Sequence, residues 1–271
     1  MDTSFDYVRD FVKNEAGIVL DAGKEYLVES RLAPLVRSEG LASIEALVQA
    51  LRASRQTDLH RKVVDAMTTN ETTFFRDVEP FELLRKELLP TLIQSRKLSK
   101  RLSIWYAASS TGQEPYSVSI LIREHFPELS DWKIEQVATD ISRKALDRAK
   151  AGRYSQLEVN RGMPAQLLLR YFEKHGLEWQ LKESIRSMVD YREMNLNSMW
   201  PRLPSFDIVF IRNVMIYFDV PAKQKILSRI YDLLRPDGYM FLGAAETTLN
   251  LDERFQRLPA NRAGCYRPVP K

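Results

Sequence analysis

The sequence has few of the residues on which several specialised classes of protein depend. Its one cysteine, Cys265, cannot form an internal disulfide, which excludes the disulfide-stabilised folds of small secreted proteins. No run of about 18 apolar residues is present, so the sequence predicts no membrane insertion. The first residues, MDTSFDYVRDFVKN, carry acids where a secretory signal has a basic start and an apolar core. We therefore expect a cytoplasmic protein.

A strong net charge is also missing. The 271 residues include 40 basic and 36 acidic side chains, which leave a formal net charge of +4. This small excess is not typical of a dedicated nucleic-acid binder, so we expect no nucleic-acid partner. The 44% hydrophobic and 28% charged residues are typical of a folded globular chain. The length predicts one large domain with a smaller appendage.

The first quarter of the chain has the spacing of helices. Apolar residues recur three and four positions apart from Phe5 to about Met67, with breaks at Gly17 and Gly40. This pattern predicts an all-α domain of three or four short helices over residues 1–67. The polar stretch that follows predicts a linker over residues 68–76.

The rest of the chain, residues 77–271, alternates between strand-like and helix-like segments. A first helix is predicted over Glu79–Ser95, and the later segments are strands 102–107, 134–139, 207–212 and 239–242, and helices 116–125, 142–151 and 221–234. Strands separated by helices predict an α/β domain with a mostly parallel sheet, which binds ligands at the carboxyl ends of its strands. Residues 153–194 fit the alternation poorly and predict an inserted small β-subdomain, with strands near 177–181 and 189–194.

Two acids follow the first two strands of the predicted sheet. The loop after the first strand lacks a phosphate-binding glycine motif, and Glu114 stands where a phosphate would meet a helix N-terminus. Asp140 ends the second strand, where an acid can accept the hydroxyls of a ribose. A nucleoside with a positive charge and no phosphate fits both acids, and S-adenosylmethionine is such a molecule. Each acid also has a structural alternative, Glu114 as a helix-start acid and Asp140 as a helix N-cap.

Four segments in order resemble the conserved blocks of one enzyme family: TNETTFFR at residues 69–76, STGQEPYS at 110–117, ATDI at 138–141 and RNVMIYF at 212–218. They are similar to the blocks of CheR-type chemotaxis receptor methyltransferases. The resemblance covers essentially the whole chain and implies a Rossmann-like class I methyltransferase domain behind the all-α domain. It also implies transfer of a methyl group from S-adenosylmethionine to glutamate side chains of bacterial chemoreceptors, with S-adenosylhomocysteine as the product.

The resemblance implies roles for ten residues and no metal site. The cofactor-binding residues that it implies are Asn70, Thr72, Arg76, Glu114, Asp140, Asn195, Leu196, Arg212 and Asn213. Arg76 and Tyr217 would face the transferable methyl group. The alternatives are that Asn70 and Thr72 only shape the linker and that Tyr217 is a core aromatic residue. The two-residue match at Asn195 and Leu196 carries the least information.

The expected chemistry needs no general base. A glutamate side chain has a pKa of about 4.3 and is an anion at neutral pH. The three histidines, His60, His125 and His175, lie outside the strand-end segments. We therefore expect Arg76 and Tyr217 to orient the substrate carboxylate, because a guanidinium can hold a carboxylate and a phenol can donate a further hydrogen bond.

The implied partner is the helical cytoplasmic region of a chemoreceptor. Residues 31–62 hold six basic side chains against Glu39, Glu45 and Asp58, and this segment could face an acidic receptor or simply be solvated. Some members of the family bind a receptor's C-terminal pentapeptide through the inserted sheet. The segment between Phe172 and Val189 is short by comparison, so we expect no pentapeptide tether.

Three alternative functions make different demands on the sequence. A nicotinamide-dependent oxidoreductase would need the missing glycine turn. An amino-methylating nucleic-acid enzyme would carry an [Asp/Asn]-Pro-Pro-[Tyr/Phe] block where this chain has Arg212 to Tyr217. A non-catalytic signalling adaptor would bind S-adenosylmethionine or S-adenosylhomocysteine and form no methyl ester.

Overall fold

The N-terminal part of the chain is a bundle of short helices. The computed structural model describes residues 3–21, 23–53, 57–259 and 262–269. Four helices lie before the linker: α1 (Ser4–Ala16), α2 (Glu25–Ser38), α3 (Ile44–Ala53) and α4 (Asp58–Met67). Thr3 and Asp6 form a capping box at the start of α1, and Gly17 ends it in a left-handed conformation. These helices have their own core, built around Val12, Leu32 and Leu47, as the apolar spacing predicts.

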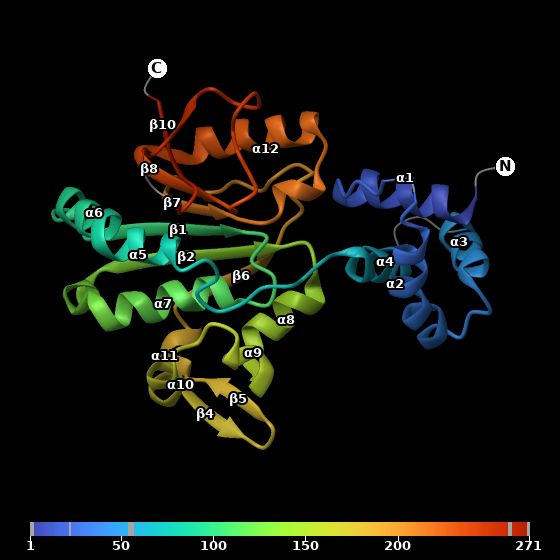
Figure 1. Cartoon of the computed structure of the whole chain (residues 1–271), viewed down its shortest axis with the longest axis horizontal. Coiled ribbons are helices and arrows are strands. Elements are labelled where there is room, and N and C mark those ends of the chain that lie inside the picture. Colours follow the sequence, from blue (N-terminus) through green and yellow to red (C-terminus); the bar gives the residue numbers. More distant parts are fainter. Residues whose placement is uncertain (1–2, 22, 54–56, 260–261, 270–271) are drawn as a thin grey trace.

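A seven-stranded sheet forms the centre of the larger domain. Its strands are β1 (Arg101–Ala107), β2 (Lys133–Asp140), β6 (Val189–Glu193), β7 (Phe206–Ile211), β8 (Leu234–Leu242), β9 (Phe255–Arg257) and β10 (Cys265–Pro268). Their order is β6-β2-β1-β7-β8-β10-β9. The pairs β8–β10 and β10–β9 are antiparallel, and the other pairs are parallel. In Figure 1, β1 runs toward the helical bundle, so the carboxyl ends of the parallel strands face that bundle.

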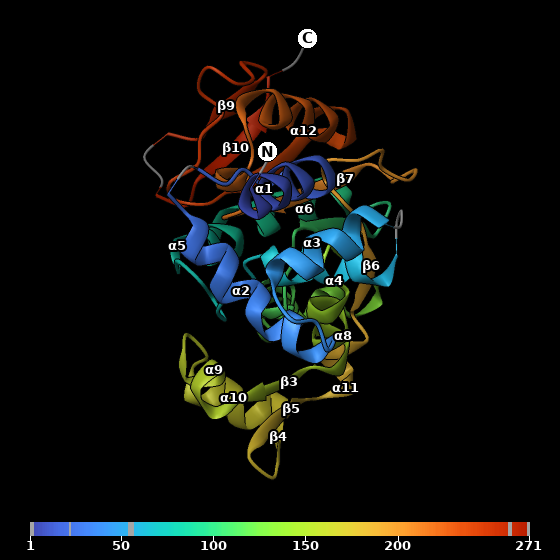
Figure 2. The same cartoon turned by 90° about the vertical axis from the view of Figure 1, so that its right-hand side faces the viewer.

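Helices cover both faces of this sheet. One face is packed by α5 (Glu79–Leu83), the π-helical turn Leu84–Leu88, α6 (Leu89–Arg96), α7 (Gln113–His125) and α8 (Arg143–Ala151), and the other by α12 (Val220–Leu233). Side chains of β1 alternate between the two layers: Ile104 and Tyr106 lie in the first, Trp105 and Ala107 in the second. Figure 1 shows α12 and α7 on opposite sides of the sheet, and Figure 2 shows the helical bundle across its end.

A separate small sheet is inserted between α8 and β6. Its antiparallel strands are β3 (Arg153–Ser155), β5 (Glu178–Leu181) and β4 (Phe172–His175), in that order. Short helical segments complete the insertion: α9 (Gln156–Asn160), α10 (Ala165–Tyr171) and α11 (Glu183–Arg186). Tyr154 and Phe172 join its core to that of the large sheet.

The predicted extent of the small subdomain, 153–194, was wrong at its C-terminal end. The strand expected near 189–194 is β6, which pairs parallel with β2 in the large sheet from Gln136 and Val189 onward. The mistake has a physical reason, because β6 is an edge strand. Its buried Val189 and Tyr191 alternate with exposed Asp190 and Arg192, and a strand of a small half-exposed sheet has the same pattern.

The two C-terminal strands were not predicted at all. β9 has three residues and β10 four, too few for a recognisable period. Cys265 begins β10 and is completely buried, and this burial raises the pKa of its thiol.

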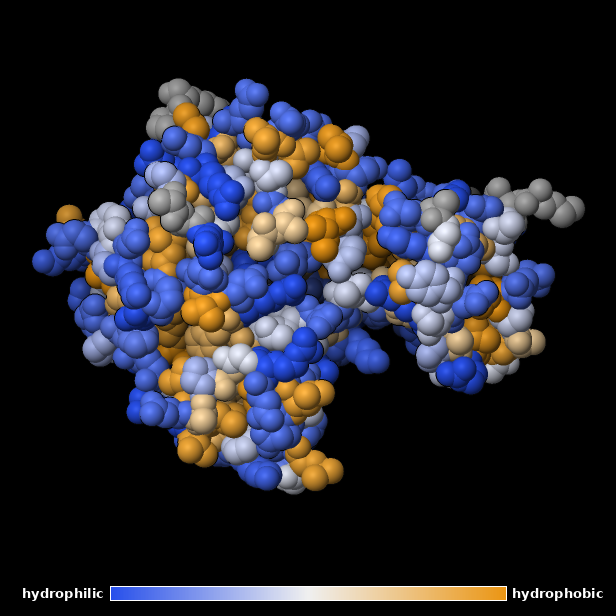
Figure 3. All heavy atoms as spheres, in the orientation of Figure 1, coloured by the Kyte–Doolittle hydropathy of each residue, from blue (hydrophilic) through white to orange (hydrophobic). Residues whose placement is uncertain are grey.

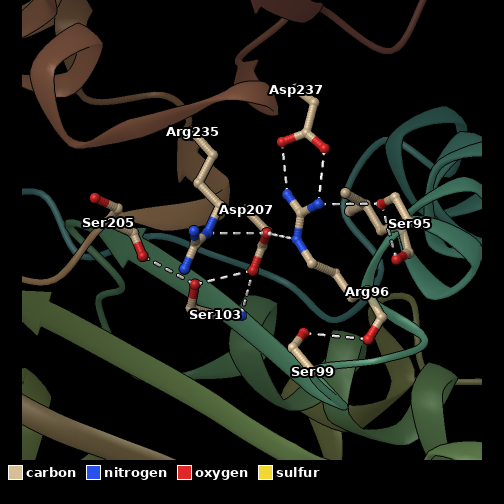
Figure 4. A network of polar contacts seen from close by, with 9 residues as sticks. Ser95, Arg96, Ser99, Ser103, Ser205, Asp207, Arg235 and Asp237 are labelled. Carbon is tan, nitrogen blue, oxygen red and sulfur yellow. Dashed lines mark hydrogen bonds and ion pairs between the residues drawn. The ribbon is translucent and has the colours of Figure 1, made fainter.

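Ion pairs fasten helix α6 to the amino-terminal end of the sheet. Asp207, almost fully buried at the start of β7, accepts hydrogen bonds from Arg96 Nε at 2.9 Å and from the Ser103 backbone N–H at 2.8 Å. The same Arg96 donates to Asp237 at the start of β8, and Arg235 approaches Asp207 from β8 (Figure 4). One arginine of α6 therefore links two strands.

The outer surface is mixed in polarity, with apolar groups at its lower end in Figure 3, over the small subdomain. Leu157, Leu169 and Leu177 are the large apolar side chains exposed there. Within the described ranges, no helix has the length and apolar character to cross a membrane.

Candidate cofactor and active site

A cavity lies between the helical bundle and the carboxyl ends of β1, β2 and β7. Its empty volume, mouth included, is about 1210 Å³, enough for a nucleoside-sized ligand. All ten residues to which the sequence analysis assigned a role line it: Asn70, Thr72, Arg76, Glu114, Asp140, Asn195, Leu196, Arg212, Asn213 and Tyr217. Their individual roles stay predictions, but the structure brings them together from five separate segments of the chain.

Asp140 ends β2 with its carboxylate held by backbone groups. Oδ2 accepts the Ser110 N–H at 2.7 Å, and Oδ1 accepts the Ser142 N–H at 2.9 Å. Burial raises the pKa of Asp140, and these backbone hydrogen bonds partly oppose the rise. The alternative that Asp140 caps the following helix was wrong, because the N-cap of α8 is Ser142, whose hydroxyl accepts the Ala145 N–H. Each carboxylate oxygen keeps lone-pair capacity for a ligand hydroxyl.

Glu114, in the first turn of α7, is paired with an arginine. Its Oε1 accepts a hydrogen bond from Arg212 Nη1 at 2.5 Å, and Arg212 Nη2 donates to Asp77 at 2.8 Å and to the Arg76 carbonyl at 3.0 Å. Burial raises the pKa of Glu114, and the Arg212 cation counteracts this. Glu114 therefore serves as an ion-pair partner inside the protein as well as a cavity wall. That Glu114 also contacts the ammonium group of a ligand stays a prediction.

The loop after β7 carries three of the predicted residues in a constrained backbone. Asn213 has a φ of +58°, a left-handed conformation rare for a residue with a side chain, and Met215–Tyr217 form a 3-10 turn. Glu246, which follows β8, accepts the backbone N–H groups of Asn213 and Ile216. The sequence analysis missed Glu246. The same signal that indicated Glu114 and Asp140, an acid just past a predicted strand, was present there.

The linker is fastened to the loop after β1. The Asn70 carbonyl accepts the Ser110 hydroxyl at 2.8 Å, and the Asn70 amide donates to Thr68 at 3.2 Å. Arg76 donates to the Glu71 carbonyl at 3.3 Å. Asn70 and Arg76 therefore have structural contacts of their own, in addition to lining the cavity.

The helical bundle forms the opposite wall. The Asn195 amide donates to the Glu15 carbonyl at 2.5 Å, and the Val19 N–H donates to the Tyr217 carbonyl at 2.9 Å. A Cβ atom added at Gly17 would lie 2.7 Å from the Phe218 ring, so only glycine allows α1 to end this close to the loop after β7. Asn195, predicted to lie by the adenine, thus also joins the two domains.

The predicted basic segment of the bundle is largely engaged within the protein. Arg31 lines the cavity and donates to the Met67 carbonyl and to Thr69 Oγ1. Lys62 pairs with Glu39 and Asp58, and Arg52 lies over the Tyr7 ring. Arg55, also part of that segment, falls outside the described residues. The structure therefore does not present these cations as one free stripe.

The cavity has the chemistry that S-adenosylmethionine requires. The Ser109 hydroxyl lines it and is buried with no hydrogen-bond partner among the described residues, so it is available to a ligand. Apolar side chains that could cover a purine are also present: Leu20, Leu27, Ile141, Leu196, Val214 and Phe218. With Asp140 for a ribose, these groups fit the nucleoside part of the cofactor.

Two family models match the chain. The one described as CheR methyltransferase, all-alpha domain, matches residues 3–68, and the one described as CheR methyltransferase, SAM binding domain, matches residues 70–263. The chain belongs to the CheR methyltransferase family. This assignment confirms the predicted family and enzyme class, the fold class and the S-adenosylmethionine cofactor, and it sets the oxidoreductase and nucleic-acid alternatives aside.

Relatives within the CheR family match over nearly the full length. The chain is 45% identical over 267 residues to chemotaxis protein methyltransferase 1 of Pseudomonas aeruginosa, with 97% of each chain covered. It is 42% identical to chemotaxis protein methyltransferase Cher2 of Pseudomonas putida, with 97% and 96% covered. The chemotaxis protein methyltransferase of Escherichia coli is 33% identical, with 94% of this chain and 87% of that one covered.

Proposed function

We propose that this CheR-family protein transfers a methyl group from S-adenosylmethionine to the side-chain carboxylate of specific glutamates on chemoreceptors, for chemotactic adaptation. The observation that carries the proposal is the single cavity in which Asp140, Glu114, Arg76 and Tyr217 meet. An acid suited to a ribose and two groups suited to a carboxylate lie within one site. When bound there, S-adenosylmethionine supplies a methyl group on a positively charged sulfur.

The residues that we expect to hold the cofactor come from the linker and the larger domain. Asp140 accepts the ribose hydroxyls, Glu114 lies by the amino-acid end, and Asn70, Thr72 and Arg76 contact it from the linker. Asn195 and Leu196 lie by the adenine, and Arg212 with Asn213 closes the pocket at the end of β7. The support is that all of these residues line the cavity.

Methyl transfer to a carboxylate is mainly a positioning task. One oxygen of the substrate anion forms the new bond to carbon, the carbon–sulfur bond breaks, and the sulfur keeps the electron pair as the neutral thioether of S-adenosylhomocysteine. No proton moves, so no base is needed. Alignment of the reacting atoms and exclusion of water can supply about 7–11 kcal/mol in well-organised systems.

Arg76 and Tyr217 are the groups that we expect to orient the substrate. Arg76 is half-buried, and its guanidinium makes one long contact of 3.3 Å to the Glu71 carbonyl, which leaves most of its donors for a carboxylate. Tyr217 is held through its backbone, since its carbonyl accepts the Val19 N–H. This contact uses only the backbone of Tyr217 and does not involve its side-chain hydroxyl.

The partner that we propose is the helical cytoplasmic region of a methyl-accepting chemoreceptor, which places the protein in the cytoplasm. The relatives' names identify them as chemotaxis methyltransferases. We further propose that binding needs no receptor pentapeptide, because only Gly176 and Leu177 connect β4 to β5. A receptor fragment with its last residues deleted should therefore be methylated with the same KM as the intact fragment. A large rise in KM on deletion would contradict the tether proposal alone.

The test of function uses purified protein, methyl-labelled S-adenosylmethionine and chemoreceptor cytoplasmic fragments. We expect label on the fragment that alkali releases as methanol, because methyl esters are base-labile. Tyr217→Phe should bind S-adenosylhomocysteine and lose most turnover, and Arg76→Ala should lose turnover and also bind more weakly, because Arg76 is expected to contact the cofactor as well. Binding without any ester in the unaltered protein would instead support the non-catalytic adaptor.

A further inference from the structure

Glu246 is a buried acid that lies behind the active-site loop and does not line the cavity. It follows β8 and is 8% exposed. Its Oε2 accepts the backbone N–H groups of Asn213 at 2.8 Å and Gly243 at 2.7 Å, and its Oε1 accepts that of Ile216 at 3.3 Å. One carboxylate thus bridges the loops that follow two neighbouring strands.

The bridge is tight on the side of β8. A Cβ atom added at Gly243 would lie 2.7 Å from Asn213 Nδ2 and 2.8 Å from Glu246 Oε2. Real Cβ atoms do not approach neighbours this closely, so a side chain at Gly243 would push the two loops apart. Asn213 in turn keeps a left-handed backbone at a φ of +58°, a conformation that persists only when its surroundings hold it.

We propose that Glu246 is a positioning residue for methyl transfer: its carboxylate holds the loop of residues 212–217 so that Tyr217 stays aimed at the reacting atoms. The proposal rests on the proposed function and adds a residue to it. Asn213 precedes the 3-10 turn Met215–Tyr217, and Ile216 lies within it, directly before Tyr217. Two of the three hydrogen bonds therefore hold the backbone just before this turn and inside it.

A carboxylate is the side chain best suited to this task. Both of its oxygens accept, and together they offer about four lone pairs, three of which are used here. Glutamine has the same shape but only one acceptor atom. Its NH₂ group would face either the Ile216 N–H or the N–H groups of Asn213 and Gly243, and two donors in contact repel each other.

The experiment compares Glu246→Gln with Glu253→Gln, the same change at an exposed glutamate of the same segment. Both proteins are assayed for receptor methylation and for S-adenosylhomocysteine affinity by calorimetry. We expect Glu246→Gln to lower kcat by about ten- to a hundredfold, the range that small misplacements cost. KM for the cofactor and the Kd should change by much smaller factors, because Asp140 and the linker are untouched. Glu253→Gln should match the unaltered protein.

A double variant separates positioning from general stabilisation. If Glu246 acts through Tyr217, Glu246→Gln should lower kcat by a much smaller factor in the Tyr217→Phe background than in the unaltered protein. Residues that act together have non-additive effects. The proposal would be overturned if the double variant lost kcat by the product of the two single factors. An unchanged kcat in Glu246→Gln would overturn it as well.

Gly243→Ala disturbs the same bridge from the other side and should give the same selective loss of kcat. It replaces Glu246→Gln if that variant does not fold. Loss of folding in both would make Glu246 a residue of the fold alone and would also overturn the proposal. Failure of the proposed function is visible beforehand, as an unaltered protein that binds S-adenosylhomocysteine and methylates no receptor fragment.

Discussion

At the scale of single residues, the site is built from acids whose surroundings are already polar. Asp140 is fixed by two backbone N–H groups and Glu114 by Arg212. Such contacts keep buried carboxylates in place before a ligand arrives, so binding does not have to order them. The acids at strand ends could be predicted from the sequence, since Asp140 ends an apolar run and Glu114 follows one after a short loop. The arginine that pairs with Glu114 could not, because Arg212 is 98 residues away in the chain.

Replacing Asp140 by alanine should weaken S-adenosylhomocysteine binding strongly. Two ligand hydroxyls would lose a charged acceptor, and each such hydrogen bond contributes about 1.5–3 kcal/mol. We expect a fall in affinity of at least about a hundredfold, measured by calorimetric titration. Asp147→Ala, an exposed acid on the neighbouring helix α8, is the matched control. Equal affinity in the two variants would contradict the ribose role of Asp140.

The affinity for S-adenosylhomocysteine should also depend on pH. Burial raises the pKa of Asp140 above its usual value of 3.8, and only the ionised carboxylate accepts both hydroxyls. Affinity should therefore be full above the raised pKa and fall as the pH is lowered through it. Unliganded stability has the opposite sign, since the folded state holds this proton more tightly and the contribution of Asp140 to stability decreases as the pH rises.

The pH measurement compares the unaltered protein with Asp140→Asn between about pH 4 and pH 7. The asparagine variant should bind more weakly throughout and show a flatter profile. Because the pKa of Glu114 is raised as well, the difference between the two profiles is the informative quantity. Identical slopes would assign the pH dependence to another group.

At the scale of helices and strands, long periodic segments were predictable and short or edge segments were not. Strand β1 and helix α12 were placed within about two residues of their observed ends, because each has a full apolar period. β6 was assigned to the wrong sheet, and β9 and β10 were missed. Edge strands and three-residue strands take their structure from the neighbours with which they pair, and a local pattern does not contain that information.

The ion pairs of Arg96, which join α6 to β7 and β8 at the far end of the sheet, should matter for stability and not for cofactor binding. Arg96→Ala removes the link between Asp207 and Asp237 (Figure 4) and leaves Asp207 with Arg235 and Ser103. Since Asp207 keeps part of its shell, we expect a loss in free energy of unfolding of about 2 kcal/mol, below the range for a fully broken buried pair. Urea titration measures it.

The control is Lys97→Ala, a change at the exposed neighbour of Arg96. It should leave the free energy of unfolding nearly unchanged. S-adenosylhomocysteine affinity should be the same in both variants, because the network lies at the amino ends of the strands and the cavity at the carboxyl ends. A loss of affinity in Arg96→Ala would show that the two ends of the sheet are coupled.

At the scale of the whole molecule, the cavity depends on how the two domains meet. Backbone carbonyls of Glu15 and Tyr217 accept two of the hydrogen bonds that cross the boundary. Every residue has such groups, so no sequence pattern marks them, and the placement of the bundle could not be derived from periodicity. The four blocks of residues that resemble CheR enzymes brought the linker and the strand ends into one prediction, but they assigned no residue of the bundle to the cavity.

Gly17→Ala tests this junction. The new methyl group would lie 2.7 Å from the Phe218 ring, and the φ of +74° adds strain of its own. We expect S-adenosylhomocysteine affinity to fall about tenfold as the bundle shifts, in addition to a loss of stability. Gly40→Ala is the control, because its φ of +66° brings similar strain of roughly 1–2 kcal/mol with no atom within 4 Å of the added group. Equal affinities in the two variants would contradict a role of Gly17 in placing the bundle against the larger domain.

The buried cysteine in β10 allows unfolding to be measured by thiol reactivity. Cys265 has no exposed surface, and its raised thiol pKa keeps it in the unreactive protonated form. A thiol reagent should therefore modify it at the rate at which the sheet opens, so that labelling followed by mass measurement reads global opening without any introduced probe. A second cysteine placed on the helical bundle could carry a dye in the folded protein while Cys265 stays silent.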